Sequence, residues 1–256
     1  MFQDKCRILA NEPICGNFYR LVLESKSIAA AAVPGQFLNI RVEQGTDFLL
    51  RRPLSIHEIK KNSVSIIYKT VGRGTGKLSL KKPKESLDVI GPLGKGYTLS
   101  DGKAVLVGGG TGVASLKFLA ADLINKQQAA VVVMIGARTR EEVLCGNEFS
   151  ELGCKVEICT EDGTLGFKGM VTSLLKQYLS VMGAHPRVVY ACGPMPMLKE
   201  VGRLTSHFRI PCEVSLEEHM GCGVGACMGC VVPARNGGYL RVCKDGPVFD
   251  AREVAL

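Results

Sequence analysis

Four cysteines near the C-terminus constrain this chain more than any other feature. They are Cys222, Cys227, Cys230 and Cys243. Their spacing, C-x4-C-x2-C followed by a more distant fourth cysteine, is that of a [2Fe–2S] ligand set. Gly223 and Gly225 carry no side chains, so the loop can wrap closely and point backbone N–H groups at sulfur. Structural zinc also takes four thiolates, but its sites usually carry two C-x2-C pairs and this chain has one. The pattern therefore favours an iron–sulfur cluster over zinc or unliganded thiols.

Composition bounds the size and the class of the protein. The chain has 256 residues, of which 46% are hydrophobic and 22% charged, enough for two ordinary domains or one large domain. The net charge is +8, but basic runs such as Lys60-Lys61 and Lys81-Lys82 are short and lack interleaved aromatic residues. Such runs are typical of solvated faces, so we expect no nucleic-acid partner.

Cysteine usage and hydropathy indicate the compartment. The chain has 11 cysteines, and those outside the motif show no ligand spacing, which is typical of free thiols in a reducing environment. The N-terminal residues have no apolar signal core, and the longest weakly charged stretch, residues 104–116, is too short to span a membrane. We therefore expect a cytoplasmic protein without a membrane partner.

Two different patterns divide the rest of the chain. In residues 1–102, strand-like segments at 18–23, 37–42 and 64–69 alternate with turn residues and predict an antiparallel β-barrel, with a single short helix at about 75–80. In residues 103–211, continuous apolar runs predict buried parallel strands separated by helices, as in a doubly wound α/β domain. These runs are residues 104–107, 130–135, 154–159 and 188–191. Residues 212–256 would then form a small third domain around the cysteine loop, which makes the chain an α+β multidomain protein.

The glycine-rich loop at residues 108–112 lies between the first predicted α/β strand and a helix at 113–125. Glycines in this position let a pyrophosphate approach the backbone and the helix N-terminus. The candidates for binding NAD are Gly109, Gly110, Thr111 and Gly112. The loop does not match the dinucleotide-binding motif G-x-G-x-x-G, because Val113 and Ser115 occupy the third-glycine positions. The acidic residue that usually follows the next strand is also absent. A tight turn without a ligand is the alternative, and Arg138 and Arg140 leave the choice between NAD and NADP open.

In the barrel half, an arginine pair and a Gly-Thr pair could bracket the diphosphate of a flavin. Residues 51–55 read Arg-Arg-Pro-Leu-Ser and offer a guanidinium fork. Gly74 and Thr75 precede the predicted short helix and offer backbone amides and a hydroxyl. Taken alone, the arginine pair would be a surface turn.

The segment Cys192-Gly193-Pro194 ends the last predicted α/β strand. Cys192 is either a core thiol before a turn or, with Gly193, a contact to the nicotinamide. No Ser/His/Asp arrangement or catalytic carboxylate pair appears, so no catalytic residue is predicted. The histidines show no pairing with a nucleophile or a metal motif and are expected to be structural or exposed. They are His57, His185, His207 and His219.

Over about its first 210 residues the chain resembles the ferredoxin–NADP reductase superfamily. The motifs that carry this resemblance occur in the family's order: Arg52-Pro53-Leu54-Ser55, Gly74-Thr75, residues 91–94 (Gly-Pro-Leu-Gly), residues 108–112 and Cys192-Gly193-Pro194. The family fold is a flavin-binding antiparallel barrel followed by a pyridine-nucleotide domain. Leu54 stands where the family usually has tyrosine, so an aromatic stack on the flavin from that position is absent.

The C-terminal segment is similar to the electron-transfer subunits of B-type dihydroorotate dehydrogenases. Residues 217–227 (EEHMGCGVGAC) and 241–249 (RVCKDGPVF) carry this resemblance and extend it over the whole chain. In that family a separate FMN-containing catalytic subunit oxidises dihydroorotate, and the resembling subunit carries FAD and a [2Fe–2S] cluster and passes the electrons to NAD+. The resemblance implies pyrimidine biosynthesis and an assembly of two subunits of each kind.

The resemblance also implies roles for particular residues. FAD would be lined by Arg52, Pro53, Leu54, Ser55, Ile67, Tyr68, Lys69, Gly74 and Thr75. The four motif cysteines would ligate the cluster. Met220, Val224 and Met228 are candidates either for the surface that meets the catalytic subunit or for the core. Two alternatives remain: the small subunit of a ferredoxin-dependent NAD(P) reductase or sulfide dehydrogenase, and a non-enzymatic cluster carrier or redox sensor without flavin.

Overall fold

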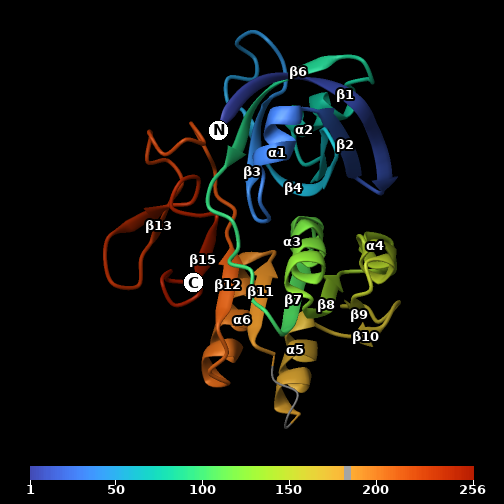
Figure 1. Cartoon of the computed structure of the whole chain (residues 1–256), viewed down its shortest axis with the longest axis vertical. Coiled ribbons are helices and arrows are strands. Elements are labelled where there is room, and N and C mark those ends of the chain that lie inside the picture. Colours follow the sequence, from blue (N-terminus) through green and yellow to red (C-terminus); the bar gives the residue numbers. More distant parts are fainter. Residues whose placement is uncertain (182–185) are drawn as a thin grey trace.

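A computed structural model describes residues 1–181 and 186–256 of the chain. Figure 1 shows a barrel at one end, a helix-flanked sheet at the other, and an irregular C-terminal segment beside both. His185 lies outside the described residues. Within these residues, no helix is long and apolar enough to cross a membrane.

The N-terminal part is a closed antiparallel barrel with the strand order β1-β2-β5-β4-β3-β6. Its strands are β1 (Phe2–Cys15), β2 (Phe18–Glu24), β3 (Phe37–Arg41), β4 (Arg52–Lys60), β5 (Ser63–Lys69) and β6 (Ser86–Leu93). Apolar side chains of the strands fill the inside of the barrel, and residues such as Leu21, Ile40 and Ile66 are completely buried. This confirms the predicted barrel and the strands expected in it.

One prediction about this half was wrong, and one of the alternatives is excluded. The described residues include α1 (Lys26–Ala31) in addition to α2 (Arg73–Ser79), whereas the sequence predicted a single helix. Ser25 is the N-cap of α1, and its hydroxyl accepts a hydrogen bond from the Ile28 backbone N–H at 3.2 Å, a local signal that was not predicted. The arginine pair is not a surface turn, because β4 begins at Arg52 and pairs with β3.

The second part is a sheet with helices on both faces and the strand order β10-β9-β8-β7-β11-β12-β15. Its strands are β7 (Lys103–Gly109), β8 (Ala130–Ala137), β9 (Lys155–Thr160), β10 (Phe167–Lys168), β11 (Val188–Cys192), β12 (Cys212–Ser215) and β15 (Val248–Asp250). All neighbours are parallel except β12 and β15. The helical segments are α3 (Gly112–Gln127), η1 (Arg140–Glu142), α4 (Gly146–Glu151), α5 (Val171–Ser180) and α6 (Met195–His207).

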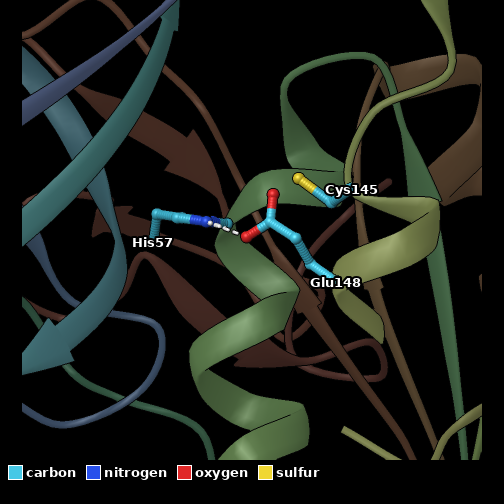
Figure 2. Close-up of side chains that lie close together, drawn as sticks. All are labelled: His57, Cys145 and Glu148. Carbon is cyan, nitrogen blue, oxygen red and sulfur yellow. Dashed lines mark hydrogen bonds and ion pairs between the residues drawn. The ribbon is translucent and has the colours of Figure 1, made fainter. Parts of the chain in front are cut away.

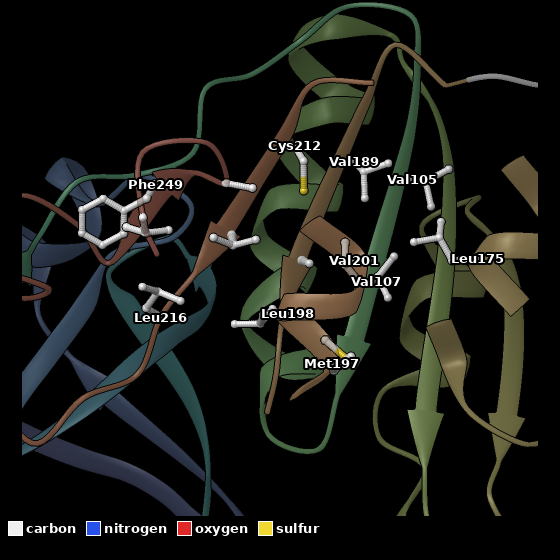
Figure 3. Packing of buried hydrophobic residues seen from close by; sticks show 14 of the residues in the cluster. Val105, Val107, Leu175, Val189, Met197, Leu198, Val201, Cys212, Leu216 and Phe249 are labelled. Atoms are coloured by element: carbon white, nitrogen blue, oxygen red, sulfur yellow. The ribbon is translucent and has the colours of Figure 1, made fainter. Parts of the chain in front are cut away.

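The strand order reverses at β7: β8, β9 and β10 follow on one side of it, and β11 and β12 on the other. This reversal confirms the doubly wound architecture. Figure 3 shows α6 packed on one face through Met197, Leu198 and Val201, all buried. α3 covers the opposite face and also lies directly beside the barrel (Figure 1). In such sheets ligands bind at the carboxyl ends of the strands where the order reverses, here the ends of β7 and β11.

The C-terminal segment contains a hairpin, β13 (Val231–Pro233) and β14 (Tyr239–Arg241), together with the cysteine loop. β12 and β15 lie beyond residue 211 but extend the sheet of the α/β part. The cysteine loop is therefore held to the α/β part by shared strands. The division of the chain into three domains, with boundaries after residues 102 and 211, stays a prediction.

Candidate functional site

One cavity of about 510 Å³ lies between the barrel, the start of α3 and the segment after β12. Nearly all residues predicted to contact a flavin line it. They are Arg52, Pro53, Leu54, Ser55, Ile67, Tyr68, Lys69 and Thr75. β4 and β5 bring these residues together, because their neighbouring ends form one wall of the cavity.

Gly74 shapes this cavity indirectly, through Arg52, whose side chain lies beside it in space. A Cβ on Gly74 would overlap the Arg52 guanidinium and lie 2.6 Å from its Cζ. The absence of a side chain thus lets the guanidinium lie against the backbone of α2, where it borders the cavity. Thr75 holds the same loop, since its Oγ1 accepts hydrogen bonds from the backbone N–H groups of Val71 at 2.9 Å and Gly72 at 3.3 Å. These residues therefore shape one end of the cavity.

A second cavity of about 610 Å³ lies at the carboxyl ends of the parallel strands. It is lined by the predicted residues Gly109, Gly110, Thr111 and Gly193, and by Arg138 and Glu161 at the ends of β8 and β9. Gly112 does not line it but permits the loop to close. A Cβ on Gly112 would overlap the Cys192 carbonyl and lie 2.7 Å from the Gly193 nitrogen.

The Cys192 thiol lies in the hydrophobic core. This is the first of the two alternatives predicted for it, a core thiol or a contact to the nicotinamide. Its side chain is completely buried among apolar residues and lines neither cavity. Burial raises the pKa of this thiol to about 12, so it remains protonated. Contact of the Cys192 side chain with a nicotinamide is therefore not supported by its position.

The two cavities meet at three residues that line both. These are Lys69 from β5, Thr111 from the glycine-rich loop and Glu217 after β12. Lys69 is held by Glu142 at 3.6 Å and lies 4.9 Å from the centre of the Phe18 ring. Burial raises the pKa of Glu217. No role for Glu217 was predicted from the sequence, because nothing in its local pattern shows that it faces two cavities.

The four motif cysteines receive backbone hydrogen bonds at their sulfur atoms. Cys222 Sγ accepts from the N–H groups of Val224, Ala226 and Cys227 at 3.3–3.4 Å. Although partial burial raises its pKa, these N–H groups outweigh that effect and lower the pKa to about 6. Cys243 Sγ accepts from Gly225 at 3.1 Å.

The remaining two cysteine sulfurs are bonded in the same way. Cys227 Sγ accepts from the Gly229 N–H at 3.4 Å, and Cys230 Sγ accepts from the Cys243 N–H at 3.4 Å. At Cys243, burial and the neighbouring Cys230 outweigh the Gly225 N–H and raise the pKa of the thiol to about 12. Backbone N–H groups that point at sulfur stabilise thiolates, as metal or cluster ligation requires.

A short stretch of chain connects the first cavity to the cysteine loop. Residues 216–220 line the cavity, and Cys222 follows after a single glycine. The loop is also tied to the barrel, because Asn39 Nδ2 of β3 donates to the Cys222 carbonyl at 3.1 Å. Met220, one of the candidates for the partner surface, is buried in the cavity wall, whereas Val224 and Met228 are exposed.

Comparisons with known proteins agree with this arrangement. Residues 217–255 match the family model described as the iron–sulfur cluster binding domain of dihydroorotate dehydrogenase B, and residues 106–203 match that of the oxidoreductase NAD-binding domain. The fold and these matches define an oxidoreductase with an iron–sulfur binding domain and a nucleotide-binding domain.

Individual relatives define the family more closely. The chain is 40% identical over 255 residues to the dihydroorotate dehydrogenase B (NAD+) electron transfer subunit of Desulforamulus reducens, covering 97% of this chain and 96% of that one. It is 43% identical to the subunit of the same name from Geobacillus thermodenitrificans, covering 99% of each chain. The protein belongs to the family of dihydroorotate dehydrogenase B electron transfer subunits.

Solved structures extend the likeness. The structure of an NADH-dependent reduced ferredoxin–NADP oxidoreductase superposes with a TM-score of 0.89 at 30% identity and covers 98% of this chain and 90% of that one. A ferredoxin reductase of carbazole 1,9a-dioxygenase has the same fold, with a TM-score of 0.69 at 20% identity, over 82% of this chain and 67% of that one.

Proposed function

We propose that the chain binds FAD in the 510 Å³ cavity, NAD in the 610 Å³ cavity and a [2Fe–2S] cluster on Cys222, Cys227, Cys230 and Cys243. As an electron transfer subunit, it would conduct electrons from the FMN of a catalytic dihydroorotate dehydrogenase subunit to NAD+, by way of the cluster and the FAD. We further propose a cytoplasmic assembly of two subunits of each kind, and a division of the chain into residues 1–102, 103–211 and 212–256 for FAD, NAD and cluster.

The observation that carries this proposal is the continuity of the three sites. Lys69, Thr111 and Glu217 belong to both cavities, and the wall formed by residues 216–220 leads within two residues to Cys222. A flavin exchanges a hydride with nicotinamide and single electrons with an iron–sulfur cluster, so it suits the central position. The order of the sites along the molecule is the order that such a transfer needs.

The residues of each site fit the group assigned to it. Arg52 and the Thr75 loop border one end of the first cavity, where a guanidinium can bind phosphate oxygens. The four cysteine sulfurs, each bonded by a backbone N–H group, suit the four thiolate ligands of a [2Fe–2S] cluster. Exposed Val224 and Met228 beside Cys222 and Cys227 offer apolar contacts for the catalytic subunit.

The proposal is tested by coexpression with the FMN-containing catalytic subunit of a relative. We expect a stable complex that reduces NAD+ when dihydroorotate is added. Replacing Cys243 by serine should abolish this NADH formation while FAD stays bound, because the change affects only the cluster. Normal NADH formation by the Cys243→Ser variant would contradict the ligand assignment.

A second candidate is the small subunit of a ferredoxin-dependent NAD(P) reductase or a sulfide dehydrogenase. Its support is the likeness to the NADH-dependent reduced ferredoxin–NADP oxidoreductase, which is 30% identical to this chain. The dihydroorotate dehydrogenase B relatives are more similar, at 40% and 43% identity. Reduced ferredoxin would then reduce NAD(P)+ in the presence of this chain, and no FMN protein would copurify with it.

A further inference from the structure

A cluster of charged side chains lies at the contact between the barrel and the α/β part. We call it the seam cluster. Its members are Arg20 of β2, His57 and Glu58 of β4, Lys117 of α3 and Glu148 of α4. His57 is completely buried, and the Lys117 side chain is only 8% exposed. From the sequence, His57 was expected to be structural or exposed, and the other four residues were assigned no role.

Glu148 and Lys117 are the centre of the seam cluster. Glu148 Oε2 accepts from Lys117 Nζ at 2.8 Å and lies 3.2 Å from His57 Nε2, while Oε1 accepts from Arg20. Lys117 Nζ also donates to Glu58 Oε1 at 2.7 Å. Glu58 also pairs with Lys60 of β4 at 3.0 Å, so both carboxylates bind cations from the barrel and from the α/β part. Figure 2 shows His57 and Glu148 facing each other across this contact.

His57 connects the seam cluster to the proposed cofactor sites. Its Nδ1 donates to the carbonyl of Ala114 at 2.7 Å, in the first turn of α3. Ala114 lines the first cavity, and Thr111, immediately before α3, lines both cavities. The barrel thus holds α3 at the end where the two cavities meet.

The seam cluster is not arranged as a metal site, although His57, Cys145 and Glu148 bring their ligand atoms within 4.8 Å of one another. A cation there would have to displace Lys117 and Arg20 from the Glu148 carboxylate. Burial and the nearby Glu148 raise the pKa of the Cys145 thiol to about 12, so this thiol keeps its proton. The geometry is that of an ion-pair network.

We propose that the seam cluster positions the two nucleotide sites relative to each other by fixing the start of α3 against the barrel. Lys117 and Glu148 are then positioning residues for hydride transfer between NADH and the flavin, an inference that rests on the proposed function. Such transfer depends steeply on the distance between the reacting atoms, and a displacement of about 1 Å can slow it on the order of 100-fold.

The test compares two lysines of the same helix. Lys117 bridges the barrel and the α/β part, whereas Lys126 pairs, among the described residues, only with Asp122 within α3, at 2.6 Å. Anaerobic stopped-flow absorbance of the FAD-loaded chain mixed with NADH gives the limiting rate of flavin reduction and the Kd of NADH. For Lys117→Met we expect a roughly 10- to 100-fold lower limiting rate and a Kd changed less than about threefold, since Lys117 lines neither cavity. Lys126→Met should match the wild type, and Lys117→Arg should restore most of the rate.

Hydrogen–deuterium exchange gives a readout that does not depend on turnover. In Lys117→Met, the amides of residues 114–117 should exchange faster than in the wild type and in Lys126→Met. A wild-type limiting rate in Lys117→Met, or equal slowing in both lysine variants, would overturn the inference. If Lys117→Met does not fold, Glu148→Gln, which keeps the size of the side chain, replaces it in both experiments. The same slower limiting rate and faster exchange are then expected. If the wild-type FAD-loaded chain is not reduced by NADH, the proposed function fails, and the exchange comparison still tests the positioning.

Discussion

Replacing Gly74 by alanine should weaken FAD binding without destabilising the fold. The new Cβ would overlap the Arg52 guanidinium, which is the mobile end of a side chain and can move away. Arg52 would then leave the cavity wall that we assign to the diphosphate. A hydrogen bond to a charged group contributes about 1.5–3 kcal/mol. Since each 1.4 kcal/mol changes Kd tenfold, FAD should bind roughly 10- to 150-fold more weakly.

Gly76 in the same helix is the matched control. A Cβ there meets no atom within 4 Å, so Gly76→Ala should leave FAD affinity unchanged. Removing a helical glycine can also stabilise the FAD-free chain by up to about 1 kcal/mol. For a chain of this size that corresponds to a rise in Tm of about 2–4 °C.

The assay is fluorescence titration of the full-length FAD-free chain with FAD, together with its thermal melting. The Arg52→Met variant and the Gly74→Ala/Arg52→Met double variant complete a cycle. We expect the double variant to bind FAD no more weakly than Arg52→Met alone, because the glycine acts through the arginine. Wild-type FAD affinity in Gly74→Ala, or additive losses in the double variant, would refute this reasoning.

Further predictions concern the nucleotide loop, the cluster and the seam. Gly112→Ala should lower Tm and weaken NADH binding, because the new Cβ would overlap backbone atoms of Cys192 that cannot rotate away, at a cost of about 1–3 kcal/mol. Calorimetry measures the Tm, and titration with NADH measures the affinity. An unchanged Tm would contradict the close contact. Cys243→Ser should remove the visible bands of the cluster while flavin absorbance persists; retained cluster bands would exclude Cys243 as a ligand. At Glu148, burial would raise the pKa, but the hydrogen bonds from His57 and Lys117 outweigh it and hold the pKa well below the usual range. The stability contributed by this carboxylate is therefore complete above its unfolded pKa of about 4.3 and is lost as pH falls below that value. The Tm difference between wild type and Glu148→Gln should narrow from pH 5 to pH 3, and a constant difference would contradict the ion-pair account.

Local sequence patterns predicted the parts of this protein whose structure is set by local chemistry. The aliphatic, β-branched and aromatic residues of β2, β3 and β5 and the continuous apolar runs of β7 and β8 are visible in the sequence, and so is the cysteine spacing. β1 was not predicted, because only Cys6 and Ile8 of its 14 residues are fully buried and its alternation is weak. Its place is set by pairing with β6, which lies about 80 residues away.

Features assembled from distant segments could not be predicted. Glu217 lies in the segment that carries the family resemblance, but its place beside both cavities follows only from the folding of β12. The seam cluster joins His57 to Glu148, residues separated by 91 positions, through contacts that exist only once the two parts pack. Cys192 illustrates the reverse case, because its motif suggested a ligand contact and its side chain is in the core.

An anaerobic ultraviolet–visible titration of the purified chain with NADH tests the central claim, that one chain connects a nucleotide site, a flavin and an iron–sulfur cluster. The account predicts flavin and [2Fe–2S] bands that bleach together as NADH is added. Flavin bands that bleach while the cluster stays oxidised would contradict the connection between the first cavity and the cysteine loop. A colourless protein after anaerobic reconstitution with FAD, iron and sulfide would contradict the whole account.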